Sequence, residues 1–170
     1  MLSFDIRAVE SQAQPVHGTL AGDDPIWEPT DPRPLDAVTV DGRLSTAGGG
    51  RFWFSGRLSG STVVACRRCL IDVTAPVSDE LSVLFAEPGL DESDEDDVYP
   101  LAANARTIDL RSAVREAWLL AVPGFVTCRD GCRGLCPTCG ADRNETACGC
   151  AERVVDERWA ALRATRDVTE

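Results

Sequence analysis

Cysteine is the residue in this sequence whose type and spacing could carry chemistry. Six of the eight cysteines of the 170-residue chain fall within one short stretch, residues 128–150. A thiolate is a soft ligand, and Zn²⁺ binds four such ligands in a tetrahedron at about 2.3 Å. The stretch is therefore a candidate metal centre, and its candidate ligands are Cys128, Cys132, Cys136, Cys139, Cys148 and Cys150.

The clearest metal-binding pattern in the stretch is Cys136-Pro137-Thr138-Cys139-Gly140. Two cysteines spaced C-x2-C can reach one metal ion when the backbone between them turns sharply. Pro137 fixes φ just after the first ligand, and Gly140 can adopt a positive φ where the chain leaves the second. The pattern predicts a zinc knuckle.

A knuckle supplies two ligands, so a complete site needs a second pair of cysteines. We favour Cys148 and Cys150 for this role, because they directly precede a helix-like run that begins near Ala151. Cys128 and Cys132, spaced C-x3-C, compete for the same role. The spacing leaves both pairings open.

The two remaining cysteines, Cys66 and Cys69, are spaced C-x2-C at the end of a predicted strand. A redox-active motif of this spacing requires a strand-to-helix context, whereas residues 71–77 have the pattern of another strand. A tight turn that holds half of a metal site, or two reduced thiols, is therefore favoured over a redox couple. Eight cysteines would suffice for two four-thiolate sites, with Cys66 and Cys69 as a weaker second pair beside Cys128 and Cys132.

Disulfides or free thiols are the alternatives to metal binding. The first residues, Met1 to Asp5, lack the basic and apolar regions of a secretory signal. No stretch approaches the roughly 18 consecutive apolar residues of a membrane span. We therefore expect a cytoplasmic protein in a reducing compartment, where cysteine clusters bind metal more often than they form disulfides.

The chain is acidic, with a formal net charge of −11 at pH 7. Such a charge disfavours binding to nucleic acid through phosphate contacts. Much of the charge lies in residues 87–97, a stretch poor in apolar residues that we interpret as a solvated loop or linker. Its carboxylates are candidates for contact with a basic partner, namely Asp91, Glu92, Asp94, Glu95, Asp96 and Asp97.

Apolar residues recur with a period of two over residues 35–86, which is the pattern of half-buried strands. Glycine- and serine-rich turns at 48–50 and 59–61 separate them. The pattern predicts an antiparallel sheet of roughly four to six strands, or a small open barrel, with hairpin connections. Its apolar positions are Val38, Val40, Leu44, Phe52, Phe54, Leu58, Val63, Ala65, Leu81, Val83 and Phe85.

Two helices are predicted after the sheet. The first opens at residues 108–110 with Asp109 as its N-cap and ends at Ala121, before Pro123 and Gly124. The second runs from about residue 151 to 164. Before the sheet, Leu2, Phe4 and Ile6 alternate like a short strand, and the prolines of residues 15–34 argue against longer regular elements. Within that segment we expect Trp27 to anchor the chain on the core and His17 to lie in a loop.

The expected fold class is therefore α+β, with an antiparallel sheet or small open barrel followed by a helix, a cysteine-rich zinc-knuckle segment and a C-terminal helix. Three parts are expected along the chain. Residues 1–86 form a β domain with an irregular N-terminal segment, and residues 87–100 form an acidic loop or linker. Residues 101–170 form a helical part that includes the zinc-binding cysteine cluster at 128–150.

The order of these features resembles the YceD-like family of large ribosomal RNA subunit accumulation proteins. The resemblance starts with Cys66-Arg67-Arg68-Cys69-Leu70 at a strand end and continues through the acidic stretch. It then follows the helix around Val114-Arg115-Glu116-Ala117, the knuckle of residues 134–140, the pair Cys148-Gly149-Cys150 and the tail of residues 156–162. The resemblance implies a role in the accumulation or maturation of the large-subunit (23S) ribosomal RNA, with no known enzymatic activity.

A non-enzymatic assembly factor is thus favoured over two alternatives. A catalytic zinc site keeps an open position and usually includes histidine or carboxylate, but the chain has one histidine, His17. A zinc-thiolate redox sensor, or a general zinc-binding interaction module, would use the same cysteines. The expected partner is a ribosomal protein or a pre-ribosomal particle of the large subunit. Contact with rRNA is left open but disfavoured by the net charge, and the arginines available for it are Arg51, Arg57, Arg67 and Arg68.

Overall fold

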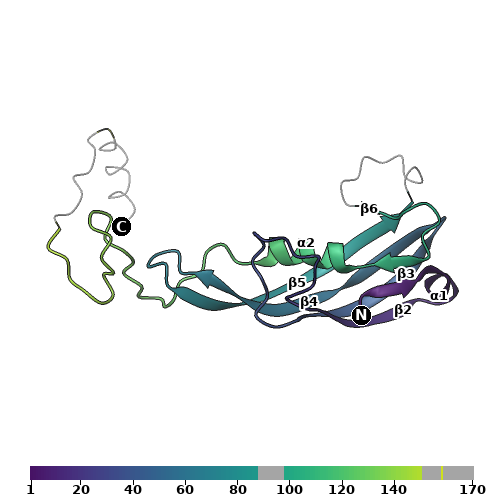
Figure 1. Ribbon diagram of the computed structural model, residues 1–170, viewed down its shortest axis with the longest axis horizontal. Helices are drawn as coiled ribbons and strands as arrows, with labels where there is room; N and C mark the ends of the chain where they lie inside the picture. Colours follow the sequence, from purple (N-terminus) through teal and green to yellow (C-terminus); the bar gives the residue numbers. More distant parts are fainter. Residues whose placement is uncertain (88–97, 151–157, 159–170) are drawn as a thin grey trace, which may run out of the picture.

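The structure, a computed structural model, describes residues 1–87, 98–150 and 158. Its centre is a five-stranded sheet in the order β2-β3-β4-β5-β6 (Figure 1). The first four of these strands pair antiparallel, whereas β6 pairs parallel to β5. The strands are β2 (Gln14–Leu20), β3 (Val38–Gly48), β4 (Arg51–Ala65), β5 (Asp72–Ala86) and β6 (Val98–Pro100).

The long strands β3, β4 and β5 contain the apolar positions predicted for the sheet. The turn predicted at 59–61 was wrong, because Arg51–Ala65 form one continuous strand, and Val63 is exposed. In β4, Phe52, Phe54 and Leu58 are buried on one face, and Trp53 on the opposite face is 41% exposed. β3 and β4 are joined through Gly48, Gly49 and Gly50, all with positive φ, which is accessible to glycine at little cost. The predicted α+β class and antiparallel sheet are confirmed, and the parallel pairing of β6 is the departure from them.

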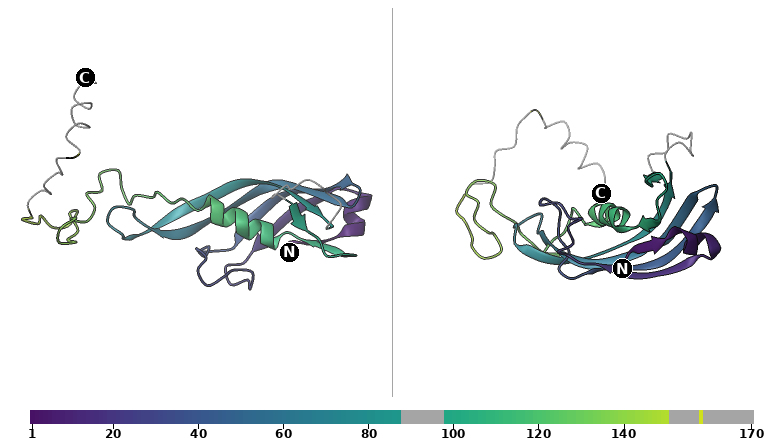
Figure 2. Two further views of the ribbon diagram at one scale, coloured as in Figure 1. Left: turned by 90° about the horizontal axis from the view of Figure 1, so that it is seen from above. Right: turned by 45° about the vertical axis from the view of Figure 1, so that its right-hand side comes forward.

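One helix, α2 (Arg111–Ala121), packs against the apolar face of the sheet (Figure 2). Trp118 of this helix is fully buried, and its indole N–H donates to the carbonyl of Pro32 at 2.8 Å. Trp27 meets it edge to face, with ring centroids 6.3 Å apart. The proline-rich segment before β3 is thereby attached to the same core as α2, and Trp27 is the anchor that the sequence predicted.

Ion pairs reinforce this attachment at the surface of α2. Arg115 bonds both carboxylate oxygens of Asp31, at 2.7 and 3.0 Å, and also pairs with Glu28 at 3.0 Å. The hydrogen bond from Arg115 holds the pKa of Asp31 below its usual value. Asp31 also accepts the backbone N–H of Glu28, so it orders the loop while it binds the helix.

The N-terminal segment holds more regular structure than the sequence predicted. Ile6 does not extend β1 (Ser3–Asp5) but begins the short helix α1 (Ile6–Ser11), whose N-cap is Asp5. The prediction of irregular chain at residues 15–20 was wrong, because Pro15 lies in β2. This strand is at the edge of the sheet, where a missing N–H need not interrupt the ladder. His17 consequently lies in a strand, not a loop, and contacts Asp41 at 2.8 Å.

The start of the predicted helix was also wrong. Residues Thr107–Asp109 form β7, which pairs with β1, and α2 begins only at Arg111 with Leu110 as its N-cap. Asp109 instead accepts the backbone N–H of Arg111 at 3.0 Å and binds its guanidinium. The predicted end at Ala121 is confirmed. The predicted C-terminal helix lies outside the described residues.

Among the helices in the described part of the chain, none is long and apolar enough to cross a membrane.

Candidate metal centre

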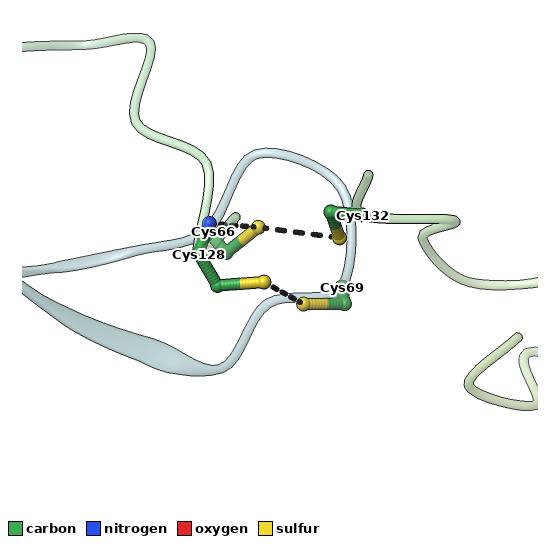
Figure 3. A group of neighbouring side chains, drawn as sticks. All are labelled: Cys66, Cys69, Cys128 and Cys132. Atoms are coloured by element: carbon green, nitrogen blue, oxygen red, sulfur yellow. Dashed lines mark hydrogen bonds between the residues drawn. The ribbon is translucent and has the colours of Figure 1, made fainter. Parts of the chain in front are cut away.

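The first cysteine cluster forms at the tip of the β4–β5 hairpin. Cys66 and Cys69 lie in the turn between these strands, and Cys128 and Cys132 reach them from the segment that follows α2 (Figure 3). The Sγ atoms of Cys66 and Cys132 are 3.8 Å apart, and those of Cys69 and Cys128 are 3.6 Å apart. All four sulfur atoms lie within 4.8 Å of one another.

These distances fit a metal better than a disulfide. Four sulfur atoms placed tetrahedrally at about 2.3 Å from Zn²⁺ are about 3.8 Å from each other, whereas a disulfide requires about 2.05 Å. None of the eight cysteines forms a disulfide in the structure. The cluster is therefore the right size for a tetrahedral thiolate-bound ion.

The second cluster brings together Cys136, Cys139, Cys148 and Cys150, again with all sulfur atoms within 4.8 Å. It is more accessible than the first. Cys139 and Cys150 are exposed, whereas in the first cluster only Cys128 is not fully buried.

The two C-x2-C pairs adopt the same turn. In the first, the N–H of Leu70 donates to the carbonyl of Cys66 at 2.9 Å, and in the second the N–H of Gly140 donates to Cys136 at 2.9 Å. Leu70 and Gly140 both have positive φ, 64° and 74° respectively. Both pairs are thus knuckles, and the first contains a leucine where the sequence pattern expects glycine.

A short segment, residues 132–144, connects the two clusters and is hydrogen-bonded to the first knuckle. The N–H of Leu135 donates to the carbonyl of Arg68 at 2.9 Å, and Arg68 in turn donates to the carbonyl of Cys132. Gly134 has φ +67°, and a Cβ there would lie 2.8 Å from the Arg68 oxygen. The close approach therefore requires glycine at this position.

Asn144 serves the first cluster from the far end of the same segment. Its amide Nδ2 lies 3.6 Å from the Sγ of Cys132, and its Oδ1 accepts the N–H of Arg133 at 2.8 Å. The N–H of Cys128 similarly points to the Sγ of Cys66 at 3.3 Å. Hydrogen bonds of this kind orient thiolate ligands and stabilise their charge.

The protein environment already favours ionisation of some thiols in both clusters, and in the first cluster the pKa values of both Cys66 and Cys132 are lowered. The backbone N–H of Cys69 is the main group that lowers the pKa of Cys66 to about 6. The backbone N–H of Cys139 acts in the same way on Cys136, whose pKa is also about 6. A divalent cation at the centre of either cluster would favour ionisation of all four thiols, because opposite charge stabilises the charged form.

Other thiols in the clusters are held in the neutral form. Burial, followed by the Cys132 thiol, raises the pKa of Cys128 to about 12. The neighbouring Cys139 thiol raises the pKa of Cys150 to about 12. Binding of a metal would therefore release protons, and its affinity would fall with falling pH.

The structure brings the candidate ligands together as two quartets. Cys148 and Cys150 join the predicted knuckle, as favoured, and Cys128 and Cys132 do not compete with them but join Cys66 and Cys69. The sequence analysis did not identify Asn144, Gly134 or Arg68 as residues that support the clusters. Of the three, only Gly134 carried a usable signal, because glycine can mark a close approach of two backbone segments.

The arginines considered for RNA binding do not form one patch. Arg51 begins β4 and Arg67 lies just beyond its end, a separation of roughly 50 Å along an extended strand. Arg57 pairs with Glu80 at 2.8 Å, and Arg67 lies 4.9 Å from the ring centroid of Phe125. Arg68 is engaged with Cys132, as described above.

Comparison with known proteins gives a family and several relatives. The family described as "Large ribosomal RNA subunit accumulation protein YceD" matches residues 54–164, a range that contains all eight cysteines. An uncharacterized protein of Mycobacterium tuberculosis strain H37Rv is 36% identical over 110 residues, covering 64% of this chain and 52% of the relative. The uncharacterized protein YlbN of Bacillus subtilis is 30% identical over 134 residues, covering 78% of this chain and 76% of the relative. The chain spans about half the length of the mycobacterial relatives it matches, and no solved structure matches it.

Proposed function

Since the chain belongs to the YceD family of large ribosomal RNA subunit accumulation proteins, we propose that it supports the accumulation or maturation of 23S rRNA without catalysing a reaction. We further propose that it acts in the cytoplasm, through an interaction surface that two zinc ions stabilise. The observation that carries the proposal is the pair of complete four-cysteine clusters within the matched range.

Zinc is the metal that suits these clusters best. Four thiolates in a tetrahedron select Zn²⁺ or an iron–sulfur centre over hard cations such as Mg²⁺ or Ca²⁺. The sulfur–sulfur distances of 3.6 and 3.8 Å in the first cluster match a single ion of about 2.3 Å bond length. The ligands of the first ion would be Cys66, Cys69, Cys128 and Cys132, and those of the second Cys136, Cys139, Cys148 and Cys150.

The donor sets support a structural role for the metal. A catalytic zinc site binds the ion through three protein ligands and leaves a position for water or substrate. Here each cluster supplies four thiols and would close the coordination sphere. The metal would then fix the hairpin tip and the segment after α2, which together form one end of the molecule (Figure 1).

The partner we propose is a ribosomal protein or a pre-ribosomal particle of the large subunit. The net charge of −11 favours a basic protein over RNA. The separation of the arginines along β4 supports the same choice, because they offer no continuous track for phosphates.

A deletion strain tests this proposal. We expect its ratio of 23S to 16S rRNA to fall and to be restored by the wild-type gene. The double variant Cys66→Ser/Cys69→Ser should fail to restore it, while the control His17→Ala, a change at an exposed side-chain contact with Asp41, should restore it. A normal ratio in the deletion strain would refute the role in accumulation, and full rescue by the cysteine variant would refute the role of the metal.

A second candidate function is a zinc-thiolate redox sensor. The exposure of Cys139 and Cys150 favours it, since oxidants would reach these sulfur atoms directly. Mild peroxide would then release one metal from the second cluster within minutes and change the binding of the partner. Retention of both metals under these conditions would exclude the sensor and leave the assembly factor.

A further inference from the structure

Strand β5 has an open edge. β6 pairs only with Leu84–Ala86, and among the described residues no strand pairs with Asp72–Val83 on the side away from β4. An unpaired strand edge presents alternating N–H and C=O groups that can accept a further strand. Pro76 has no N–H and limits such pairing to the part of β5 that follows it.

A groove runs beside this edge, between β5 and α2. It has a volume of about 270 Å³ and is lined by residues 79–83 of β5, by Tyr99, and by residues of α2 that face the strand. Figures 1 and 2 show α2 lying along β5. The residues of α2 in its lining are Ala113, Glu116, Ala117 and Leu120.

The groove is acidic. Asp79, Glu80 and Glu116 line it, and none of the described residues in its lining is an arginine or lysine. Glu80 is balanced by Arg57, and Glu116 accepts a hydrogen bond from the Tyr99 hydroxyl. Within the described residues, the carboxylate of Asp79 has no side-chain partner and accepts only the backbone N–H of Glu80, at 2.9 Å.

Asp79 occupies an unusual position for a charged residue. It lies opposite Leu58 and shares with Val77 and Leu81 the face of the sheet that α2 covers. Leu58, Val77 and Leu81 are 0%, 2% and 3% exposed, whereas the side chain of Asp79 is exposed. The apolar face of the sheet is thus open at this point and carries a carboxylate.

Apolar surface flanks the carboxylates. Val83 is half-buried, and Leu120 at the rim of the groove leaves 79% of its surface exposed. A strand lying in the groove could therefore place a basic side chain near Asp79 and Glu116 and an apolar one near Leu120. Side chains at alternate positions of a strand supply this combination.

We propose that the edge of β5 from Asp79 to Val83, together with α2, binds an extended basic segment of a partner protein as an additional strand. The inference rests on the proposed function only in taking that partner to be a ribosomal protein. Backbone hydrogen bonds supply affinity, and the carboxylates select lysine and arginine.

The charge of the groove disfavours the other occupants. A second copy paired through the same edge would place two acidic grooves beside each other, which is unfavourable. The phosphates of RNA would be repelled for the same reason. The segment that joins β5 to β6 is itself rich in Asp and Glu, so it does not complement the groove either.

Binding of a synthetic peptide to the full-length, zinc-loaded protein tests the proposal. The probe is a fluorescent peptide of about nine alternating lysine and valine residues, with a second version N-methylated at alternate amides. We expect Asp79→Asn/Glu116→Gln to weaken binding of the first peptide at least about tenfold at low salt. The control Asp23→Asn/Asp36→Asn, which removes the same charge from exposed positions in the loop before β3, should change it less than about twofold. The N-methylated peptide should not bind, and hydrogen exchange at residues 79–83 should slow when the first peptide binds.

Three results would overturn the proposal. Equal weakening by both double variants would mean that only the overall charge attracts the peptide. Equal binding of the N-methylated peptide would exclude strand addition. Self-association of the chain with protection of residues 79–83 would assign the edge to a second copy. The peptide assay uses neither cells nor rRNA, so a failure to bind the peptide would not refute the proposed role in rRNA accumulation. Conversely, a normal rRNA ratio in the deletion strain would not refute binding of the peptide.

Discussion

Substitution of Gly134 by alanine tests whether the two clusters are held together as the structure describes. Gly134 has φ +67°, and a Cβ added to it would lie 2.8 Å from the carbonyl oxygen of Arg68 in the first knuckle. Gly140 of the same segment and Gly131 just before it provide matched controls. Gly140 has φ +74° with nothing within 4 Å of an added Cβ, and Gly131 has neither a positive φ nor a close neighbour.

The expected loss of stability on substitution by alanine differs among the three glycines, because they differ in backbone conformation and in the space around an added Cβ. A left-handed backbone costs a non-glycine residue about 1–2 kcal/mol, and a contact that forces the backbone to shift costs about 1–3 kcal/mol more. The lower entropy of the unfolded chain with alanine offsets about 0.4–1 kcal/mol. We therefore expect Gly134→Ala to destabilise the segment by about 2–3 kcal/mol and Gly140→Ala by about 1 kcal/mol, while Gly131→Ala is neutral or slightly stabilising.

Competition with a chromogenic zinc chelator measures these differences, because metal binding and folding of such a segment are one process. A change of 1.4 kcal/mol corresponds to a tenfold change in affinity. Gly134→Ala should thus weaken zinc retention by roughly 30- to 150-fold and Gly140→Ala by roughly fivefold. Equal effects of Gly134→Ala and Gly140→Ala would show that the contact with Arg68 is absent in solution, and the account of how the clusters are joined would be wrong.

Three further predictions concern the rest of the fold. Trp118→Ala should lower the free energy of unfolding by about 3–5 kcal/mol, and Trp118→Phe by about 1–3 kcal/mol because the carbonyl of Pro32 loses its donor. Urea unfolding measures both, and an unchanged free energy of unfolding in Trp118→Phe would contradict the role of the hydrogen bond. Removal of metal with a chelator should leave the sheet folded, because its core consists of its own apolar residues; complete loss of the strand signal in circular dichroism would contradict this. Asp31→Asn should lower the free energy of unfolding at pH 7. The difference from wild type should disappear as the pH falls below about 4, because a carboxylate with a lowered pKa stabilises the fold only while it is ionised. Urea titrations measure this difference, and a difference that persists at pH 2 would mean that Asp31 acts through packing.

The sequence was informative where the signal is local. Alternating apolar residues placed β3, β5 and the first part of β4, although the turn predicted at 59–61 lies inside β4. Pro137 and Gly140 identified the second knuckle from five consecutive residues. The first knuckle carried a weaker signal because Leu70 takes the left-handed conformation that glycine usually marks. Its partners are also distant, since Cys66 and Cys132 are 66 positions apart. No spacing rule predicts that the segment after α2 returns to the hairpin tip.

Long-range pairing also explains the errors near the N-terminus. The prolines suggested irregular chain, but at the edge of a sheet Pro15 is tolerated, and the edge position depends on the order of all the strands. Similarly, residues 107–109 are a strand only because β1 lies beside them. The division of the chain at residues 86 and 100 stays a prediction.

Native mass spectrometry of the protein purified from growing cells, combined with alkylation of its thiols, tests the central claim most directly. We predict two zinc ions per chain and eight thiols that react with the alkylating agent only after the metal is removed. Cys66→Ser/Cys69→Ser should retain one ion, because the second cluster has its own four ligands. One ion or none in the wild-type protein, or a mass deficit that indicates disulfides, would contradict the assignment of two thiolate-bound metal sites.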